Sequence, residues 1–158
     1  MKEKFEKTNV MRLLDAAGIG YKTHTYTDSN AVSGLDVAEF LGQDPDRMFK
    51  TLVTVGRTGE HYVFVVPVSG ELNLKKAASV SGEKSIEMIK QKELLPLTGY
   101  IHGGCSPIGM KKVYRTFVDE TALCFDSIIF SAGKIGYQVE LAPQDLTAVI
   151  HADFCDIT

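Results

Sequence analysis

Apolar residues recur at helical spacing in four segments of the chain, a pattern typical of helices that pack one face on a core. Ser, Thr or Asn, whose side chains cap helices well, precedes three of the segments, and Gly follows each of these three. The fourth has a proline in its first turn, where proline is tolerated. The sequence therefore predicts helices that begin near Thr8, Ser33, Asn73 and Pro143, the first three ending at Gly18, Gly42 and Gly82.

Segments rich in β-branched and aromatic residues lie between the expected helices and are typical of strands. Residues 133–136, a Gly-Lys-Ile-Gly turn, join the last two of them as a hairpin. Residues 86–95 fit either a strand or a short helix. The predicted strands are residues 21–26, 48–55, 62–68, 113–118, 127–130 and 137–141.

The order of these elements indicates an α+β fold and not a regular alternation of strands and helices. We expect a curled, mixed but largely antiparallel sheet with flanking helices. Glycines in the hairpins would let the sheet curl, so a partly closed, barrel-like form is expected. The 158 residues contain no repeat or long linker, which predicts a single domain over residues 1–158.

The overall composition is that of an ordinary globular protein, with 44% hydrophobic and 23% charged residues. The formal net charge of -3 does not mark a general nucleic-acid binder. Any contact with an anionic polymer would need a local basic surface or a second protein. The alternative for the basic residues is a solvated face. Those that could form such a surface are Lys75, Lys76, Lys84, Lys90, Lys92, Lys111, Lys112, Arg115 and Lys134.

The cysteines and the N-terminal segment favour a cytoplasmic protein. Cys105, Cys124 and Cys155 are odd in number and have no framework spacing, which fits a reducing compartment. The first seven residues are charged and lack the apolar core of a signal peptide. The longest apolar run, residues 62–68, is too short to span a bilayer. We expect no membrane association.

Lys50 interrupts a strand that is otherwise mostly apolar on both faces. Alternation along a strand puts its side chain on the same face as Met48, Leu52 and Thr54. An ammonium group among apolar neighbours is costly unless it meets an anion or an oxygen-rich partner. We therefore interpret Lys50 as a cation that lines a pocket, with the hydroxyl or backbone N–H of Thr51 nearby. An edge lysine that reaches solvent is the alternative.

A second candidate is the turn-forming stretch 103–109, Gly-Gly-Cys-Ser-Pro-Ile-Gly. Two adjacent glycines let backbone N–H groups approach a ligand closely, so the stretch predicts a cradle for a carbonyl or carboxylate oxygen. Its spacing matches neither a nucleotide-binding glycine loop nor a Gly-x-Ser-x-Gly nucleophile elbow. Cys105 with His102 as its base is an alternative nucleophile, although no third orienting group accompanies them. No metal or cofactor is expected, because no second pair of metal-ligand residues is spaced for one.

Several short motifs occur in order along nearly the whole chain. They are Tyr26 after His24-Thr25, Phe49-Lys50-Thr51-Leu52, Leu72-Asn73-Leu74-Lys75-Lys76, Thr98-Gly99-Tyr100, Gly103-Gly104-x-Ser106-Pro107-x-Gly109 with Lys111-Lys112, and Ser131-x-Gly133-Lys134-x-Gly136 before Glu140-Leu141. In combination, though not singly, they resemble the YbaK/EbsC family of Cys-tRNA(Pro) deacylases. That family is related to the editing domain of bacterial prolyl-tRNA synthetases.

The resemblance implies roles for particular residues. Lys50 corresponds to the essential lysine of the family, and Gly103 is expected beside it in catalysis. The positions implied to surround the substrate are Tyr26, Thr51, Ser131 and Gln138, together with Gly104, Ser106 and Pro107 of the glycine motif. Two residues depart from the family pattern: relatives often carry Asp at Gln138 and an aliphatic residue at Cys105.

The resemblance also implies an activity, the removal of cysteine from mischarged Cys-tRNA(Pro) by attack of the substrate's own thiol on its ester carbonyl. Lys50 would then steady the terminal ribose or phosphate, or the developing charge. Two other functions remain open: deacylation of Ala-tRNA(Pro), and a non-catalytic module that binds a synthetase or tRNA. The expected partners are aminoacyl-tRNA, specifically tRNA(Pro), and prolyl-tRNA synthetase. The sequence does not determine the oligomeric state.

Overall fold

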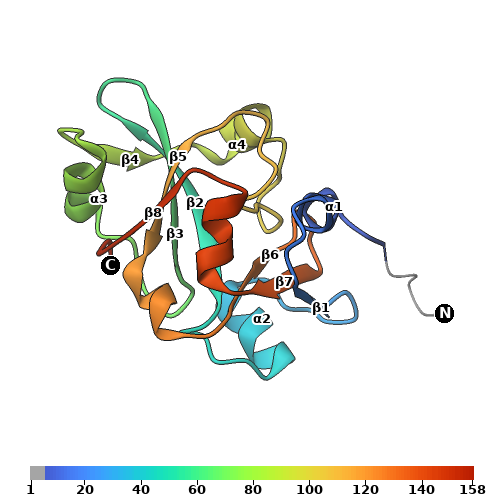
Figure 1. The fold of residues 1–158 in the computed structure, drawn as a ribbon. Helices are drawn as coiled ribbons and strands as arrows, with labels where there is room; N and C mark the ends of the chain where they lie inside the picture. Colours follow the sequence, from blue (N-terminus) through green and yellow to red (C-terminus); the bar gives the residue numbers. More distant parts are fainter. Residues whose placement is uncertain (1–5) are drawn as a thin grey trace.

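The computed structural model describes residues 6–158, which form two sheets with helices around them (Figure 1). Residues 1–5, on which part of the argument against a signal peptide rests, lie outside the described residues. The helices are α1 (Asn9–Ala16), α2 (Gly34–Leu41), α3 (Leu74–Ser81), α4 (Gln91–Thr98) and the 3-10 helices η1 (Glu120–Cys124) and η2 (Pro143–Ala148). The strands are β1 (Lys22–Thr25), β2 (Phe49–Gly56), β3 (His61–Pro67), β4 (Ile86–Met88), β5 (Arg115–Asp119), β6 (Ile128–Ser131), β7 (Tyr137–Leu141) and β8 (Ala152–Cys155). None of the helices formed by residues 6–158 is long and apolar enough to cross a membrane.

The larger sheet has the strand order β4-β2-β3-β5-β8, and the smaller one has the order β1-β7-β6. Strand β5 pairs in parallel with both β3 and β8, whereas the other pairings between strands are antiparallel. The prediction of an α+β fold with a mixed, largely antiparallel sheet is therefore confirmed. No closed barrel forms within residues 6–158: the strands stay in two sheets, which an isolated parallel bridge between Met48 and Ile129 joins.

The helix starts predicted from capping residues are confirmed. The Thr8 side chain accepts a hydrogen bond from the backbone N–H of Met11 at the start of α1. Ser33 and Asp36 form a reciprocal capping box at the start of α2. The Asn73 side chain accepts from the first backbone N–H groups of α3. These local signals were sufficient because each cap satisfies N–H groups that the helix itself leaves unpaired.

The C-terminal part of the chain differs from the prediction. The expected closing helix is the short 3-10 helix η2, and the unpredicted strand β8 follows it. Strand β8 has the sequence Ala-Asp-Phe-Cys, which has little intrinsic strand preference, and it forms because it pairs with the edge strand β5. The ambiguous stretch 86–95 contains both elements, since β4 ends at Met88 and α4 begins at Gln91.

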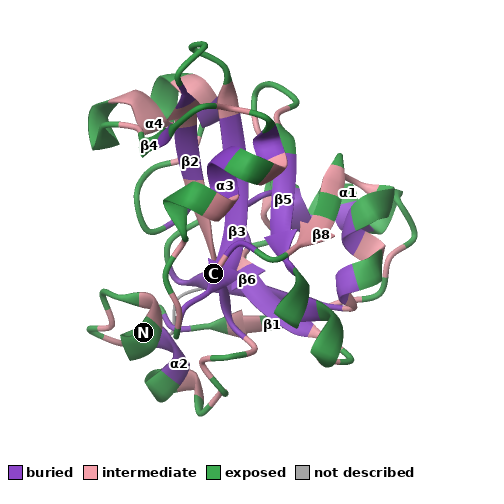
Figure 2. Cartoon of the chain, turned by 90° about the vertical axis from the view of Figure 1, so that its left-hand side faces the viewer, coloured by how far each residue is buried: buried purple, intermediate pink, exposed green. Residues whose placement is uncertain are grey.

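The alternating side chains of β3 divide the core between the two faces of the larger sheet. Tyr62, Phe64 and Val66 face α3, which lies across that side of the sheet in Figure 2. Val63 and Val65 face the opposite way, into a core shared with α1 and the smaller sheet. A third cluster joins α2 to the start of β2 and the end of β3. The two sheets and α2 thus meet at the start of β2.

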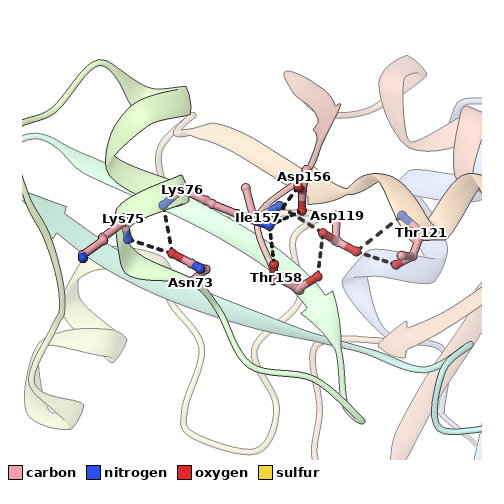
Figure 3. A network of polar contacts seen from close by, with 8 residues as sticks. All are labelled: Asn73, Lys75, Lys76, Asp119, Thr121, Asp156, Ile157 and Thr158. Atoms are coloured by element: carbon pink, nitrogen blue, oxygen red, sulfur yellow. Dashed lines mark hydrogen bonds and ion pairs between the residues drawn. The ribbon is translucent and has the colours of Figure 1, made fainter.

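The C-terminus is fixed by what we call the C-terminal anchor: Asn73, Lys76, Asp119, Thr121 and residues 156–158 (Figure 3). The Asp119 carboxylate, which is 1% exposed, accepts hydrogen bonds from the Thr121 N–H and hydroxyl, the Ile157 N–H and the Thr158 hydroxyl. Lys76 Nζ donates to the Asp156 carboxylate and the Thr158 carbonyl. Hydrogen bonds therefore hold the last residues of the chain against the end of β5 in the larger sheet.

Candidate active site

A cavity of about 410 Å³ lies where α2, β2, the β4–α4 segment and residues 102–105 meet. It brings together residues that are far apart in the sequence, and in particular it places Lys50 and Gly103 on the same cavity. The predicted site residues that line it are Tyr26, Lys50, Thr51, Gly103, Ser131 and Gln138. Their roles in binding or catalysis remain predictions, but their proximity is a feature of the fold.

Met48 and the first five residues of β2, 49–53, line the cavity without interruption. Side chains alternate between the two faces of a strand, so a cavity over one face would contact only every second residue. Contact with each successive residue indicates that the cavity lies against the edge of the strand, where the backbone itself is accessible. This edge is available because β4 pairs only with residues 54–56, at the other end of β2.

Apolar side chains from several elements form the rest of the cavity wall, and sequence analysis did not assign them to the site. They include Val37 from α2, Val68 after β3, and Ile89 and Leu94 around the start of α4. Helix α2 approaches closely because residue 34 is glycine: a Cβ there would lie 2.7 Å from a methyl carbon of Val68. No local motif marks these residues, because the cavity forms only when the elements pack together.

Lys50 is only loosely held at the cavity. Its ammonium nitrogen lies 3.8 Å from Glu71 Oε1, and the two side chains are 32% and 93% exposed. An ion pair at this distance with one partner in solvent contributes at most about 1 kcal/mol. An incoming anion or polarised oxygen could therefore replace Glu71 at little cost.

Two residues that line the cavity carry a buried side-chain atom with no hydrogen-bond partner among the described residues: Thr51 Oγ1 and Gln138 Oε1. A buried polar atom without a partner costs about 1–3 kcal/mol, so native structures contain few of them. Thr51 lies on β2 and Gln138 on β7, and both residues line the same cavity. A ligand with matching polar groups would satisfy both of them.

Tyr26 and Ser131 complete the polar wall from the smaller sheet. Tyr26 extends β1, and its backbone N–H donates to the Gly136 carbonyl at 2.8 Å. The Ser131 hydroxyl accepts from the Gly133 N–H at 3.1 Å, which shapes the turn into β7. Since Ser131 and Gln138 are cross-strand partners, these side chains are fixed relative to one another by the β6–β7 pairing.

The glycine motif contributes to the cavity through fewer residues than predicted. Gly104, Ser106 and Pro107 do not line it. The Gly104 N–H donates to the Ile101 carbonyl at 3.0 Å, and the buried Ser106 hydroxyl accepts from the Ile108 N–H at 3.3 Å. Pro107 lines a separate cavity of about 270 Å³. These three residues therefore shape the loop that presents Gly103.

Positive φ angles show why the loop needs glycine. Gly103 has a φ of +90°, a conformation that costs other residues free energy. Gly109 has a φ of +80°, and a Cβ there would lie 2.8 Å from the Tyr100 hydroxyl oxygen. That hydroxyl donates to the Ile108 carbonyl, which packs the loop against α4 and the segment that follows it.

Cys105 and His102, the alternative nucleophile and its base, also line the cavity. Burial raises the pKa of the Cys105 thiol to about 12. At neutral pH the group is therefore a protonated thiol, and the thiolate is the reactive form. Cys105 therefore forms part of the cavity wall and is not an activated nucleophile.

Glu140 forms a second polar cluster directly beside Gln138 on β7. Its carboxylate accepts from the Ser127 hydroxyl and contacts His24 Nε2 at 2.8 Å. Burial acts to raise the pKa of Glu140, but the hydrogen bonds with Ser127 and His24 outweigh it and hold the pKa below its ordinary value. This carboxylate already has its partners, in contrast to the neighbouring amide of Gln138.

Comparison with known proteins gives consistent matches. Residues 28–149 match the family model of the aminoacyl-tRNA editing domain. The chain is 46% identical over 158 residues to the Enterococcus faecalis protein EbsC, whose name proposes it as a Cys-tRNA(Pro)/Cys-tRNA(Cys) deacylase; the match covers 99% of this chain and 96% of that protein. It is also 39% identical over 77 residues to a proline–tRNA ligase of Pelobacter propionicus, covering 49% of this chain and 13% of the ligase. A crystal structure described as a proposed trans-editing enzyme for prolyl-tRNA synthetase superposes with a TM-score of 0.82 at 25% identity, covering 94% of each chain.

Proposed function

The chain belongs to the aminoacyl-tRNA editing domain family, and from this membership we propose that it is a trans-acting deacylase that removes cysteine from mischarged Cys-tRNA(Pro). The observation that carries the proposal is the cavity lined by Lys50, Gly103, Thr51 and Gln138, the last two of which carry a buried side-chain atom without a partner among the described residues. An aminoacyl ester has the groups that such a cavity lacks: a carbonyl and a ribose for Lys50, and an ammonium group for oxygen acceptors.

The reaction needs a nucleophile, and the substrate can supply it. Cys105 is a poor candidate because its pKa is raised to about 12. In the proposed reaction the substrate sulfur adds to its own ester carbonyl carbon, and the ribose oxygen leaves with the proton that the thiol gives up. The product is a four-membered thiolactone, which water then opens to free cysteine. Well-oriented intramolecular attack can be worth about 7–11 kcal/mol, and ring strain reduces that gain here.

This mechanism provides selectivity without a tightly fitting pocket. Rejection of a substrate by one methylene group gives only about 1–3 kcal/mol, which is too little for proofreading. A reaction that requires a thiol excludes serine and alanine on chemical grounds. Gly103 would serve by letting the backbone approach the ester, and Lys50 by stabilising the ribose, the phosphate or the developing charge.

The net charge of -3 indicates that the protein alone would hold tRNA weakly, because affinity for nucleic acid depends mainly on neutralised phosphates. Prolyl-tRNA synthetase is therefore the proposed partner that holds the tRNA, as the similarity to part of a proline–tRNA ligase supports. Such a deacylase would act where translation takes place, in the cytoplasm. Tight binding of tRNA(Pro) by the isolated protein at physiological salt would contradict the need for a partner.

The decisive experiment is a deacylation panel on Cys-, Ser-, Ala- and Pro-tRNA(Pro) with the wild type, Lys50→Ala and Lys22→Ala. Lys22 is an exposed lysine of β1 outside the cavity and serves as the matched control. We expect selective release of cysteine by the wild type and by Lys22→Ala, and a loss of about 10²–10³-fold in kcat for Lys50→Ala.

The other outcomes of the panel identify the other functions. Comparable release of Cys, Ser and Ala would show that water attacks the ester directly, and preferential release of Ala would show an Ala-tRNA(Pro) deacylase. A pure binding module would release none of the amino acids. Its affinity for tRNA would be the same in the wild type and in Lys50→Ala. Each of these results would overturn the proposed activity.

A further inference from the structure

The hydrogen-bond pattern of β2 shows which backbone groups face the cavity. The Gly56 N–H donates to the Glu60 carbonyl, and the Val68 N–H donates to the Met48 carbonyl, both at 2.8 Å. In an antiparallel pair, residues alternate between those that bond to the partner strand and those that point away from it. The even-numbered residues of β2 therefore bond to β3, and the backbone groups of the odd-numbered residues point to the opposite edge.

Other elements cover that opposite edge at its two ends only. At one end β4 pairs with residues 54–56, and the Val53 carbonyl accepts from the Ile89 N–H at 3.3 Å. At the other end the bridge from β6 lies at Met48, where the Ile129 N–H donates to the Arg47 carbonyl at 3.1 Å. In Figure 1, β4 and β6 accordingly lie toward opposite ends of β2. Between them, Thr51 faces no partner strand on this side within residues 6–158.

An unpaired strand edge at a cavity offers backbone donors in fixed positions. The Thr51 N–H points into this gap, and the Oγ1 atom of the same residue is buried without a partner among the described residues. The Gly104 N–H, in contrast, is already engaged with Ile101 in the loop. The rigid ladder to β3 holds Thr51 in place, which is the property that a donor to developing charge requires.

From this arrangement we propose that the Thr51 backbone N–H is a catalytic hydrogen-bond donor to the ester carbonyl oxygen, which lies against the open edge of β2. This inference rests on the proposed deacylase function. As the nucleophile adds to the carbonyl carbon, the π-electron pair moves onto the oxygen, and the Thr51 N–H stabilises the resulting oxyanion. When the pair returns, the ribose oxygen leaves and takes the proton that the nucleophile gave up.

The test replaces the N–H without removing the side chain. The α-hydroxy analogue of threonine, introduced at position 51, converts that amide into an ester, which removes the N–H and weakens the Lys50 carbonyl as an acceptor in the β2–β3 ladder. The same analogue at Thr54, an even-numbered residue outside the cavity lining, is the matched control because its N–H belongs to the β2–β3 ladder. Thr51→Val removes the hydroxyl and keeps the N–H.

We expect the position-51 ester to lower kcat for Cys-tRNA(Pro) by about 10²–10³-fold in single-turnover assays. Its Kd for a non-hydrolysable, amide-linked Cys-tRNA should change little. Its urea midpoint should fall less than that of the position-54 ester, because the Thr51 N–H is outside the ladder and only the acceptor at Lys50 is weakened. The position-54 ester should lower the urea midpoint and keep kcat. Thr51→Val should retain most of the kcat that the ester loses.

Two results would overturn the inference while leaving the function intact. One is an active wild type whose position-51 ester keeps kcat within about threefold. The other is a rise in Kd that equals the whole loss in kcat/KM, since that would show ground-state binding only. A wild type that releases no cysteine would instead contradict the proposed function itself.

Discussion

In the C-terminal anchor, Asp119 accepts four hydrogen bonds, whereas in the cavity Thr51 Oγ1 and Gln138 Oε1 are buried with no partner among the described residues. Both regions bury polar atoms between strands of the same small molecule. The anchor uses them to fix the chain terminus on β5. The cavity region leaves them unsatisfied near the start of β2 and near the start of β7.

This difference separates stability from function. A satisfied buried network stabilises the fold, and removal of one member leaves its partners unpaired. An unsatisfied group lowers the stability of the free protein. That stability is restored only when a ligand supplies the missing hydrogen bond. Substitutions in the two regions should therefore have opposite effects on stability and activity.

The largest expected effect is on the anchor. Asp119→Ala removes the acceptor for four hydrogen bonds and leaves the buried N–H of Ile157 without its partner. We expect the free energy of unfolding to fall by about 3 kcal/mol or more, measured by urea denaturation. Deacylation per folded molecule should stay near that of the wild type, because the anchor does not line the cavity.

Asp153→Ala is the control for this prediction. Asp153 is an exposed carboxylate on β8, the same strand that leads into the anchor. Its replacement should change stability by less than about 0.5 kcal/mol. Equal destabilisation by the two variants would show that the hydrogen bonds of Asp119 are not the source of its effect.

A smaller effect with the opposite sign is expected in the cavity. Gln138→Leu removes a buried amide whose Oε1 has no partner, so the free energy of unfolding should stay the same or rise by up to about 1 kcal/mol. The kcat/KM for Cys-tRNA(Pro) should fall about 10–100-fold, because the substrate loses a polar contact. Gln144→Leu, at an exposed position of η2, is the matched control. A clear loss of stability with unchanged activity would place Gln138 with the anchor, as a structural residue.

The smallest effect concerns Glu140, a satisfied carboxylate two residues from Gln138. Its folded-state pKa lies below the ordinary value of 4.5, since the hydrogen bonds from Ser127 and His24 outweigh its burial. A lowered pKa stabilises the fold above about pH 4.5, and this stabilisation is lost as the pH falls through the folded-state pKa. The stability gap between the wild type and Glu140→Gln should therefore be widest near pH 7 and narrow toward pH 3.5. A constant gap in urea denaturation across this range, or the same narrowing for the exposed Glu39→Gln, would contradict the assignment.

Much of the site was predictable because its chemistry lies in short motifs. Lys50 stands out as a charge in an apolar strand, and the glycine motif is marked by residues that tolerate positive φ. Resemblance to a family added Tyr26, Ser131 and Gln138. The assignment of Gly104, Ser106 and Pro107 to substrate contacts depended on the motif alone, and the structure places them in the architecture of the loop.

The sequence by itself determined the capped helices, the central strands, and the lysine and glycines of the site, because each depends on residues that are close along the chain. Tertiary structure alone decided that β8 completes the larger sheet, that residues 156–158 close on Asp119, and that β4 and β6 leave the edge of β2 open at Thr51. These features depend on pairing between distant segments. Local preference carries no information about which strand edge is covered and which remains free.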